Sequence, residues 1–259
     1  MKDFKNSVRV EVAAGLEESD TAIALRQKFM GGDDAPMTLS LDEDGLSLIS
    51  EGKTLKGDFT KMINRIKPQS VGSELLVKAA KIKDAGEKMR AIDATAGLGD
   101  DSILLAAAGF YVTMYEQNPV IYELLCDAKR RAESDSFLVN IVSRMEIYNL
   151  DSIEAMKSVE NAPDVILLDP MFPERQKSAL VKNKLQVIQS IEMPCTNEVD
   201  MLYAATVAKP KRIVIKRPPK GEFLAGVKPD YSISGKAVRF DCIAVPYDKR
   251  HKMFKNIVE

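Results

Sequence analysis

The sequence predicts an α/β protein, in which a mostly parallel sheet is covered by helices on both faces and a small α+β subdomain precedes it. From residue 90 onward, short apolar runs alternate with segments of helical spacing, a pattern typical of such a sheet. Before residue 65, polar and apolar residues alternate around turn signals instead. A glycine-rich turn also joins the first strand of the later region to its first helix. We therefore expect residues 1–65 to form the subdomain and residues 66–259 the larger domain.

The first 65 residues contain two strand patterns with a helix pattern between them. Residues 8–13 and 38–50 alternate polar and apolar side chains, and Asp44-Gly45 is a favourable hairpin turn within the second segment. Residues 19–30 have helical spacing, begin at a serine or aspartate cap and stop before two glycines. This order is typical of a compact α+β unit.

Two further helical patterns, residues 58–66 and 73–82, lead to the larger domain. Basic side chains surround their junction, at Lys61, Arg65, Lys67 and Lys78. Such charges usually mark a solvated face, so a solvated connector is favoured here over a hinge that contacts RNA.

The larger domain alternates predicted strands and helices. The strand-like runs are residues 91–92, 111–115, 145–148, 165–168 and 212–215. The helical patterns are residues 101–108, 119–134, 153–159 and 198–207. A last alternating run, residues 238–245, predicts an antiparallel strand at the edge of the sheet.

Composition excludes several classes of protein. No apolar run reaches the length of about 18 residues that spans a bilayer, so no membrane association is expected. The 3 cysteines are odd in number and far apart, which suits a reducing cytoplasm. The chain has 37 lysines and arginines against 38 acidic residues, so any RNA contact must come from a local patch. A single histidine, His251, excludes histidine triads and multi-histidine metal sites, and no metal is predicted.

The turn DATAGLGDD, residues 93–101, predicts a ligand-binding corner. Gly97 and Gly99 allow the backbone to turn tightly and to approach a ligand. The dinucleotide fingerprint has a third glycine where this chain has Ser102, which weakens a nicotinamide dehydrogenase interpretation. Asp100 and Asp101 disfavour a pyrophosphate at the start of the helix and suit a zwitterionic or cationic ligand such as S-adenosylmethionine.

Two other acidic residues extend this interpretation. Asp93 suits the amino-acid end of S-adenosylmethionine, and Glu116, at the end of the second strand, is placed to accept hydrogen bonds from both ribose hydroxyls. The alternative is that Asp100 and Asp101 only cap the helix, which is compatible with binding.

The loop DPMFP, after the fourth strand, predicts the reaction. Ligands of open α/β sheets lie beyond the carboxyl ends of the strands. Asp169 and the carbonyl of Pro170 could accept the hydrogens of an exocyclic amine of guanine or adenine, and Phe172 could stack on the extruded base. The alternative makes Asp169 a loop cap and Phe172 a core residue.

Basic residues flank this loop on both sides. The first group is Arg175, Lys177, Lys182 and Lys184, and the second includes Lys216 and Arg217. Isolated basic runs are usually solvated faces, but two runs beside one candidate site also fit a track for a phosphate backbone.

Several of these motifs together resemble one bacterial family. The motifs IDATAGLGDD, YEQNP, LLDPMFPERQKSALVKNK, VIKRP and GKAVRFD resemble the small-subunit ribosomal RNA (guanine-N2) methyltransferase J family. The resemblance implies a class I S-adenosylmethionine-dependent methyltransferase, with a Rossmann-like fold, that methylates the N2 of a guanosine. It implies cofactor contacts at Asp100, Asp101, Glu116, Gln117, Asp151, Ser152 and Asp169.

We therefore expect a cytoplasmic enzyme whose cofactor is S-adenosylmethionine and whose partner is small-subunit ribosomal RNA or the small ribosomal subunit. Two alternatives stay open. One is an amine methyltransferase for another RNA, for DNA or for a protein amide. The other is a non-catalytic RNA-binding assembly factor with a methyltransferase fold.

Overall fold

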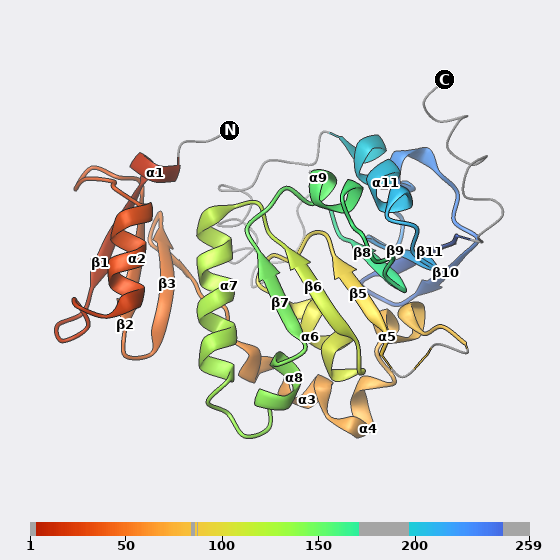
Figure 1. Ribbon diagram of the computed structural model, residues 1–259, viewed down its shortest axis with the longest axis horizontal. Coiled ribbons are helices and arrows are strands. Elements are labelled where there is room, and N and C mark those ends of the chain that lie inside the picture. Colours follow the sequence, from red (N-terminus) through yellow and green to blue (C-terminus); the bar gives the residue numbers. More distant parts are fainter. Residues whose placement is uncertain (1–3, 84–85, 87, 171–196, 246–259) are drawn as a thin grey trace.

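The computed structural model describes residues 4–83, 86, 88–170 and 197–245, which form two β-sheets with helices around them (Figure 1). The smaller sheet has 4 strands in the order β1-β2-β3-β4, and the larger has 7 strands in the order β10-β11-β9-β8-β5-β6-β7. The α/β class expected from the sequence is confirmed. Among the described residues, no helix combines the length and apolar character needed to cross a membrane.

The smaller sheet confirms the predicted strands, hairpin and helix. Its elements are α1 (Phe4–Ser7), β1 (Val8–Val12), α2 (Asp20–Lys28), β2 (Met37–Asp42), β3 (Gly45–Ser50) and β4 (Lys53–Leu55). Strand β1 pairs with β2 in parallel, and β2 pairs with β3 through a tight turn. The Ser19 side chain caps α2 by accepting a hydrogen bond from the Ala22 amide.

Four short helical segments connect the sheets: η1 (Phe59–Met62), α3 (Ile63–Ile66), α4 (Pro68–Val71) and α5 (Leu75–Ala80). The sequence predicted helix on both sides of Pro68 but not α4, because proline was taken as a break and instead begins a helix. Phe59, Met62 and Ile66 are buried in the core of the larger sheet. The boundary at residue 65 stays a prediction.

The larger sheet confirms the predicted alternation of strands and helices. Its strands are β5 (Arg90–Asp93), β6 (Tyr111–Tyr115), β7 (Met145–Tyr148), β8 (Val165–Leu168), β9 (Arg212–Arg217), β10 (Tyr231–Ser234) and β11 (Arg239–Ala244). Its helices are α6 (Asp100–Ala107), α7 (Pro119–Ala132), α8 (Val139–Val142), α9 (Ser152–Lys157), α11 (Glu198–Val207) and the 3₁₀ turn η2 (Leu224–Gly226). Strands β5 to β9 run in parallel.

One strand position differs from the prediction. Residues 238–245 were expected at the edge, but β11 lies between β9 and β10, antiparallel to both. The edge strand on this side of the sheet, next to β11, is β10, which the sequence did not predict. Its four residues, YSIS, are mostly exposed and give little alternation to detect.

Apolar residues fill both faces of the larger sheet. One face packs against α5 and α6, and the other against α9 and α11 (Figure 1). A third cluster joins the smaller sheet to α7, through Leu46 and Leu48 on one side and Val120 and Leu124 on the other. Helix α7 therefore packs against both sheets and fixes the smaller one beside the larger.

The order of the parallel strands reverses between β5 and β8. Strands β5, β6 and β7 follow one another in one direction, and β8 and β9 follow in the other. Ligands of open α/β sheets bind outside the carboxyl ends of the strands at such a switch point. Asp93 ends β5, and Asp169 directly follows β8.

Candidate functional site

The glycine turn lies at this switch point, between β5 and α6. Gly97 and Gly99 have φ of +54° and +82°, in the left-handed region that glycine adopts readily. A Cβ added at Gly99 would lie 2.8 Å from Leu125 and 3.0 Å from Phe59, so packing requires a glycine. Among the described residues, the nearest neighbour of a Cβ added at Gly97 would be the Thr95 carbonyl oxygen, 4.0 Å away. A ligand could approach the backbone there.

Glu116, at the end of β6, closes the turn. Its carboxylate accepts hydrogen bonds from the Gly97 amide at 3.0 Å and the Asn118 amide at 2.7 Å. Asn149 donates to the Glu116 carbonyl at 2.7 Å. A carboxylate has about four acceptor positions, so these bonds orient Glu116 without excluding the predicted ribose contact, which stays a prediction.

Asp93 lies beneath the turn and is only 1% exposed. It accepts a hydrogen bond from the Ser102 hydroxyl at 2.6 Å and another from the Thr95 amide at 3.1 Å. Burial raises the pKa of Asp93 to about 6, although the bond from Ser102 lowers it. Asp93 therefore supports the turn from inside, whereas the sequence analysis assigned it to the amino-acid end of S-adenosylmethionine, a contact that stays a prediction. Ser102 binds Asp93 where the dinucleotide fingerprint has glycine.

Asp169 lies beside the turn, at the carboxyl end of β8. Its amide donates a hydrogen bond to the Thr95 hydroxyl at 2.8 Å. Its side chain is 38% exposed and forms an ion pair with Lys216 of β9 at 2.9 Å. The same ammonium lies 2.5 Å from Asp101 of α6. Thr95, which the sequence analysis did not single out, and Lys216, which it assigned to RNA, thus join the turn to Asp169.

Burial and the neighbouring charges shift the pKa values of Asp169 and Lys216. Burial raises the pKa of Asp169, and the neighbouring Lys216 opposes that rise. Burial alone would lower the pKa of Lys216, but Asp101 and Asp169 outweigh it and raise that pKa well above its ordinary value. Lys216 is therefore fully charged at neutral pH.

The remaining predicted cofactor residues lie along the same edge of the sheet. Asp100 begins α6 and is exposed, and Gln117 is exposed after β6. Asp151 caps α9 by accepting a hydrogen bond from the Ile153 amide at 2.8 Å, and Ser152 is the first residue of that helix. The structure thus brings all of these residues to the carboxyl ends of β5, β6 and β7, but their cofactor contacts stay predictions.

The residues predicted to contact RNA are either engaged within the protein or lie outside the described part of the chain. Arg217 is 4% exposed, its guanidinium donates to the Glu222 carbonyl at 2.6 Å, and it lies 3.6 Å from Glu198. This buried position does not fit a phosphate contact, because successive residues of a strand point to opposite faces and Arg217 points inward. Lys216 is engaged with two carboxylates. The other predicted residues of the loop lie outside the described residues: Phe172, Arg175, Lys177, Lys182 and Lys184.

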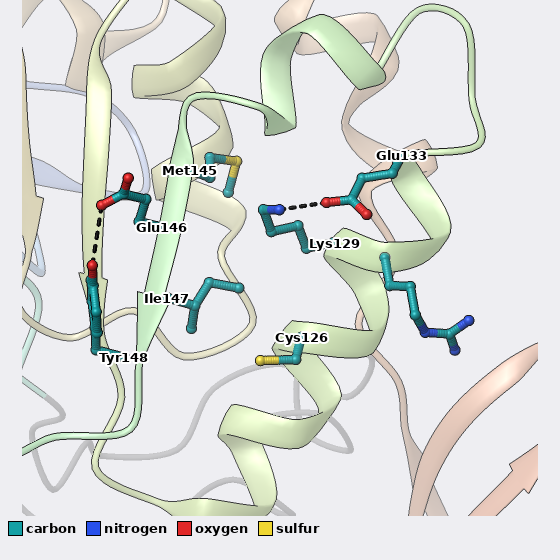
Figure 2. A pocket seen from close by; sticks show the side chains of 8 residues that line it. Cys126, Lys129, Glu133, Met145, Glu146, Ile147 and Tyr148 are labelled. Carbon is teal, nitrogen blue, oxygen red and sulfur yellow. Dashed lines mark hydrogen bonds and ion pairs between the residues drawn. The ribbon is translucent and has the colours of Figure 1, made fainter. Parts of the chain in front are cut away.

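A hollow of about 490 Å³ lies elsewhere, between α7 and the edge strand β7 (Figure 2). Cys126 and Lys129 line it from the helix, and Ile147 and Tyr148 from the strand. None of its lining residues belongs to the predicted site, and its charged Lys129 is paired with Glu133. Within the described part of the chain, no group of acidic, cysteine or histidine side chains is arranged to hold a metal ion.

The residues at the switch point fit S-adenosylmethionine. No described residue crowds Gly97, so within this part of the chain a ligand can reach the turn. Asp100, at the start of α6, disfavours a phosphate and suits a cationic group, whereas the charge of Asp101 is paired with Lys216. Asp169 offers an exposed acceptor beside them.

Comparison with known proteins identifies related methyltransferases. The family model "Putative SAM-dependent methyltransferase" matches residues 22–245. The ribosomal RNA small subunit methyltransferase J of Thioalkalivibrio sulfidiphilus is 37% identical over 252 residues, which cover 93% of this chain and 98% of that protein. The protein of the same name from Acinetobacter baylyi is 37% identical over 79% of each chain.

A solved structure is also similar. The crystal structure of a SAM-dependent methyltransferase from Neisseria gonorrhoeae has a TM-score of 0.74 and 29% sequence identity, and the match covers 92% of this chain and 96% of that one. The family model and the relatives cover both the glycine turn and Asp169. The chain therefore belongs to the ribosomal RNA small subunit methyltransferase J family of S-adenosylmethionine-dependent methyltransferases.

Proposed function

We propose that this enzyme transfers a methyl group from S-adenosylmethionine to the exocyclic N2 amine of a guanosine in small-subunit ribosomal RNA. The observation that carries the proposal is the position of Asp169, which Thr95 ties to the glycine turn at the switch point. The names of the relatives support the choice of ribosomal RNA.

The cofactor half of the site consists of the glycine turn and the adjoining strand ends. We propose that the cofactor is held by Gly97, Gly99, Asp100, Asp101, Glu116, Gln117, Asp151 and Ser152, with Asp93 supporting the turn from below. When bound, S-adenosylmethionine supplies a sulfonium methyl group that an amine nitrogen can take up directly.

The acceptor half consists of Asp169 and Pro170. The lone pair of the guanine amine is delocalised into the ring, so the enzyme must hold the N–H groups to orient the nitrogen. The Asp169 carboxylate and the Pro170 carbonyl can accept those hydrogen bonds, which also stabilises the positive charge that develops on nitrogen. The carboxylate can then take the proton that the amine loses.

The RNA half of the proposal depends on residues outside the described part of the chain. Phe172 would stack on the target base. Arg175, Lys177, Lys182 and Lys184 would contact the phosphate backbone. We place the reaction in the cytoplasm, where small ribosomal subunits assemble.

The test is mass spectrometry of ribosomal RNA nucleosides from cells with and without the gene. Deletion should lower N2-methylguanosine in small-subunit RNA, and the wild-type gene should restore it, whereas an Asp169→Asn variant should not. An unchanged level after deletion would rule out the assignment. Incubating the purified protein separately with naked ribosomal RNA, small subunits, other RNA, DNA and protein then identifies the substrate.

A further inference from the structure

Lys216 joins the two halves of the site through a single ammonium, which contacts Asp101 at 2.5 Å and Asp169 at 2.9 Å. We propose that Lys216 is a positioning residue for methyl transfer, which holds Asp169 against the cofactor turn and keeps it ionised so that it accepts the N–H groups of the target amine. This inference rests on the proposed function and departs from the RNA contact that the sequence suggested for Lys216.

The strand register explains why Lys216 reaches both carboxylates. Leu168 pairs with Ile215, so Lys216 is level with Asp169 across the β8–β9 ladder. Val214 is buried on the sheet face that packs against α6. Because side chains of a strand alternate, Lys216 points to the same face, where Asp101 lies in the first turn of α6.

The local charges show why an ammonium matters at this position. The charged groups that act on Asp169 are Lys216 in contact, Asp101 and Asp93 of the cofactor turn, and Arg217 of β9. Arg217 is already near Glu198, and Arg65, which lies near Asp100 and Asp101, is paired with Glu74. Without Lys216, Asp101 and Asp169 would lose the ammonium that contacts both of them, and repulsion among Asp93, Asp101 and Asp169 would favour protonation.

Protonation of Asp169 would remove its function. A neutral carboxyl group carries its own O–H donor and loses part of its capacity to accept hydrogen bonds. It also loses the negative charge that stabilises a developing cation on the amine nitrogen. Arginine would keep the charge but replace a compact group with a planar fork, so it should restore the function only in part.

The experiment compares the full-length wild-type protein with K216M, K216R and a matched control, K228M, whose lysine is exposed and is not one of the predicted site residues. Carboxyl ¹³C NMR follows the titration of Asp169, assigned with D169N. Single-turnover methyl transfer to small subunits is measured in parallel between about pH 6 and 9.5, and calorimetry gives the cofactor affinity.

In K216M, the Asp169 titration should move to higher pH. Methyl transfer at pH 7 should fall by about 10- to 100-fold, and the deficit should shrink as the pH rises, because Asp169 then ionises again. K216R should recover only part of the loss, and K228M should match the wild type. An unshifted titration with the same deficit at every pH would reduce Lys216 to a packing role and overturn the proposal.

Two further outcomes separate this inference from its rivals. If Lys216 contacted phosphate instead, K216M would lower the salt dependence of RNA binding by about one counterion and leave the titration unchanged. If the wild-type enzyme methylated no ribosomal RNA, the proposed function would fail, but the NMR titration needs no RNA and would still decide whether Lys216 controls Asp169.

Discussion

The Asp93 carboxyl is buried beneath the glycine turn, where Ser102 and Thr95 donate hydrogen bonds to it. Its folded-state pKa of about 6 lies above the ordinary value of 3.8, because burial disfavours the charged form. The folded protein therefore holds this proton more tightly than the unfolded chain. The stabilisation is fully present below the unfolded pKa and is lost as the pH rises through the folded one.

This linkage predicts the behaviour of Asp93→Asn, which keeps the shape but cannot ionise. Between about pH 4 and 6, the free energy of unfolding of the wild type should fall relative to that of the variant, by up to about 3 kcal/mol. Urea unfolding at several pH values measures both curves. Parallel curves across this window would contradict the assigned pKa.

Thr95 holds the Asp169 loop through one hydrogen bond. Thr95→Val keeps the side-chain shape but leaves the Asp169 amide without this acceptor, at a cost of about 1–3 kcal/mol. We expect the rate of methyl transfer to fall at least about 10-fold while the cofactor Kd changes much less, since the loop and not the turn is released. Calorimetry and single-turnover assays measure the two quantities. Thr113→Val on β6, outside the site, is the control, and equal losses in both variants would exclude this role.

The residue types of the site could be predicted from the sequence, but their contacts could not. Acidic residues at strand ends and glycines in a turn are local signals. The Thr95–Asp169 bond joins residues 74 positions apart, and the Lys216–Asp101 bond joins residues 115 positions apart. Only the strand order brings them together, so Lys216 was predicted to bind RNA from its basic neighbours alone.

Within the glycine turn, we expect substitution of Gly99 to affect mainly stability and substitution of Gly97 to affect mainly cofactor binding. Gly99→Ala would force a Cβ against Leu125 and Phe59 at positive φ, which should destabilise the protein by about 1–3 kcal/mol. Gly97→Ala meets no such neighbour among the residues that the structure describes, so it should cost only about 1 kcal/mol in stability. Its methyl group would occupy space proposed for the cofactor, and we expect the cofactor Kd to rise at least about 10-fold. Thermal unfolding and calorimetry on both variants test this contrast, which a reversed order would contradict.

Strands with strong local patterns were predicted accurately. Strands β6, β7 and β8 occupy the predicted residues because each is a short run bounded by turn signals. The elements that were missed, α1, α4, α8, η2, β4 and β10, have only three or four residues each, and tertiary contacts rather than local propensity hold such short segments. The alternation of residues 238–245 identified a strand, but alternation contains no information about which strands lie on either side.

At the scale of the whole molecule, α7 couples the two sheets. Asp127 on this helix is 4% exposed and accepts hydrogen bonds from the Leu46 amide at 2.9 Å and from Arg131 at 2.8 Å. Arg131 in turn donates to the Gly57 carbonyl. The smaller sheet is therefore attached to α7 by buried polar contacts as well as apolar ones.

Asp127→Ala should weaken this attachment. The variant leaves the buried Leu46 amide without its partner and Arg131 without its carboxylate, so we expect a loss of about 3–5 kcal/mol in stability. Hydrogen exchange should quicken in β2 and β3 more than in β5 and β6. Glu133→Ala removes an exposed ion pair on the same helix and should change stability by less than about 1 kcal/mol. Uniform acceleration across both sheets would show that the two do not open separately.

Leu98, in the middle of the glycine turn, belongs to the same buried cluster as Leu46 and Leu48 of the smaller sheet. A genetic screen for loss of methylation should therefore recover two groups of mutants. One group maps to the turn and the Asp169 loop, and the other maps to the first 55 residues, where no substituted side chain needs to meet either substrate. Mutants of the second group should be rescued by lower growth temperature, whereas substitutions of Asp169 should not.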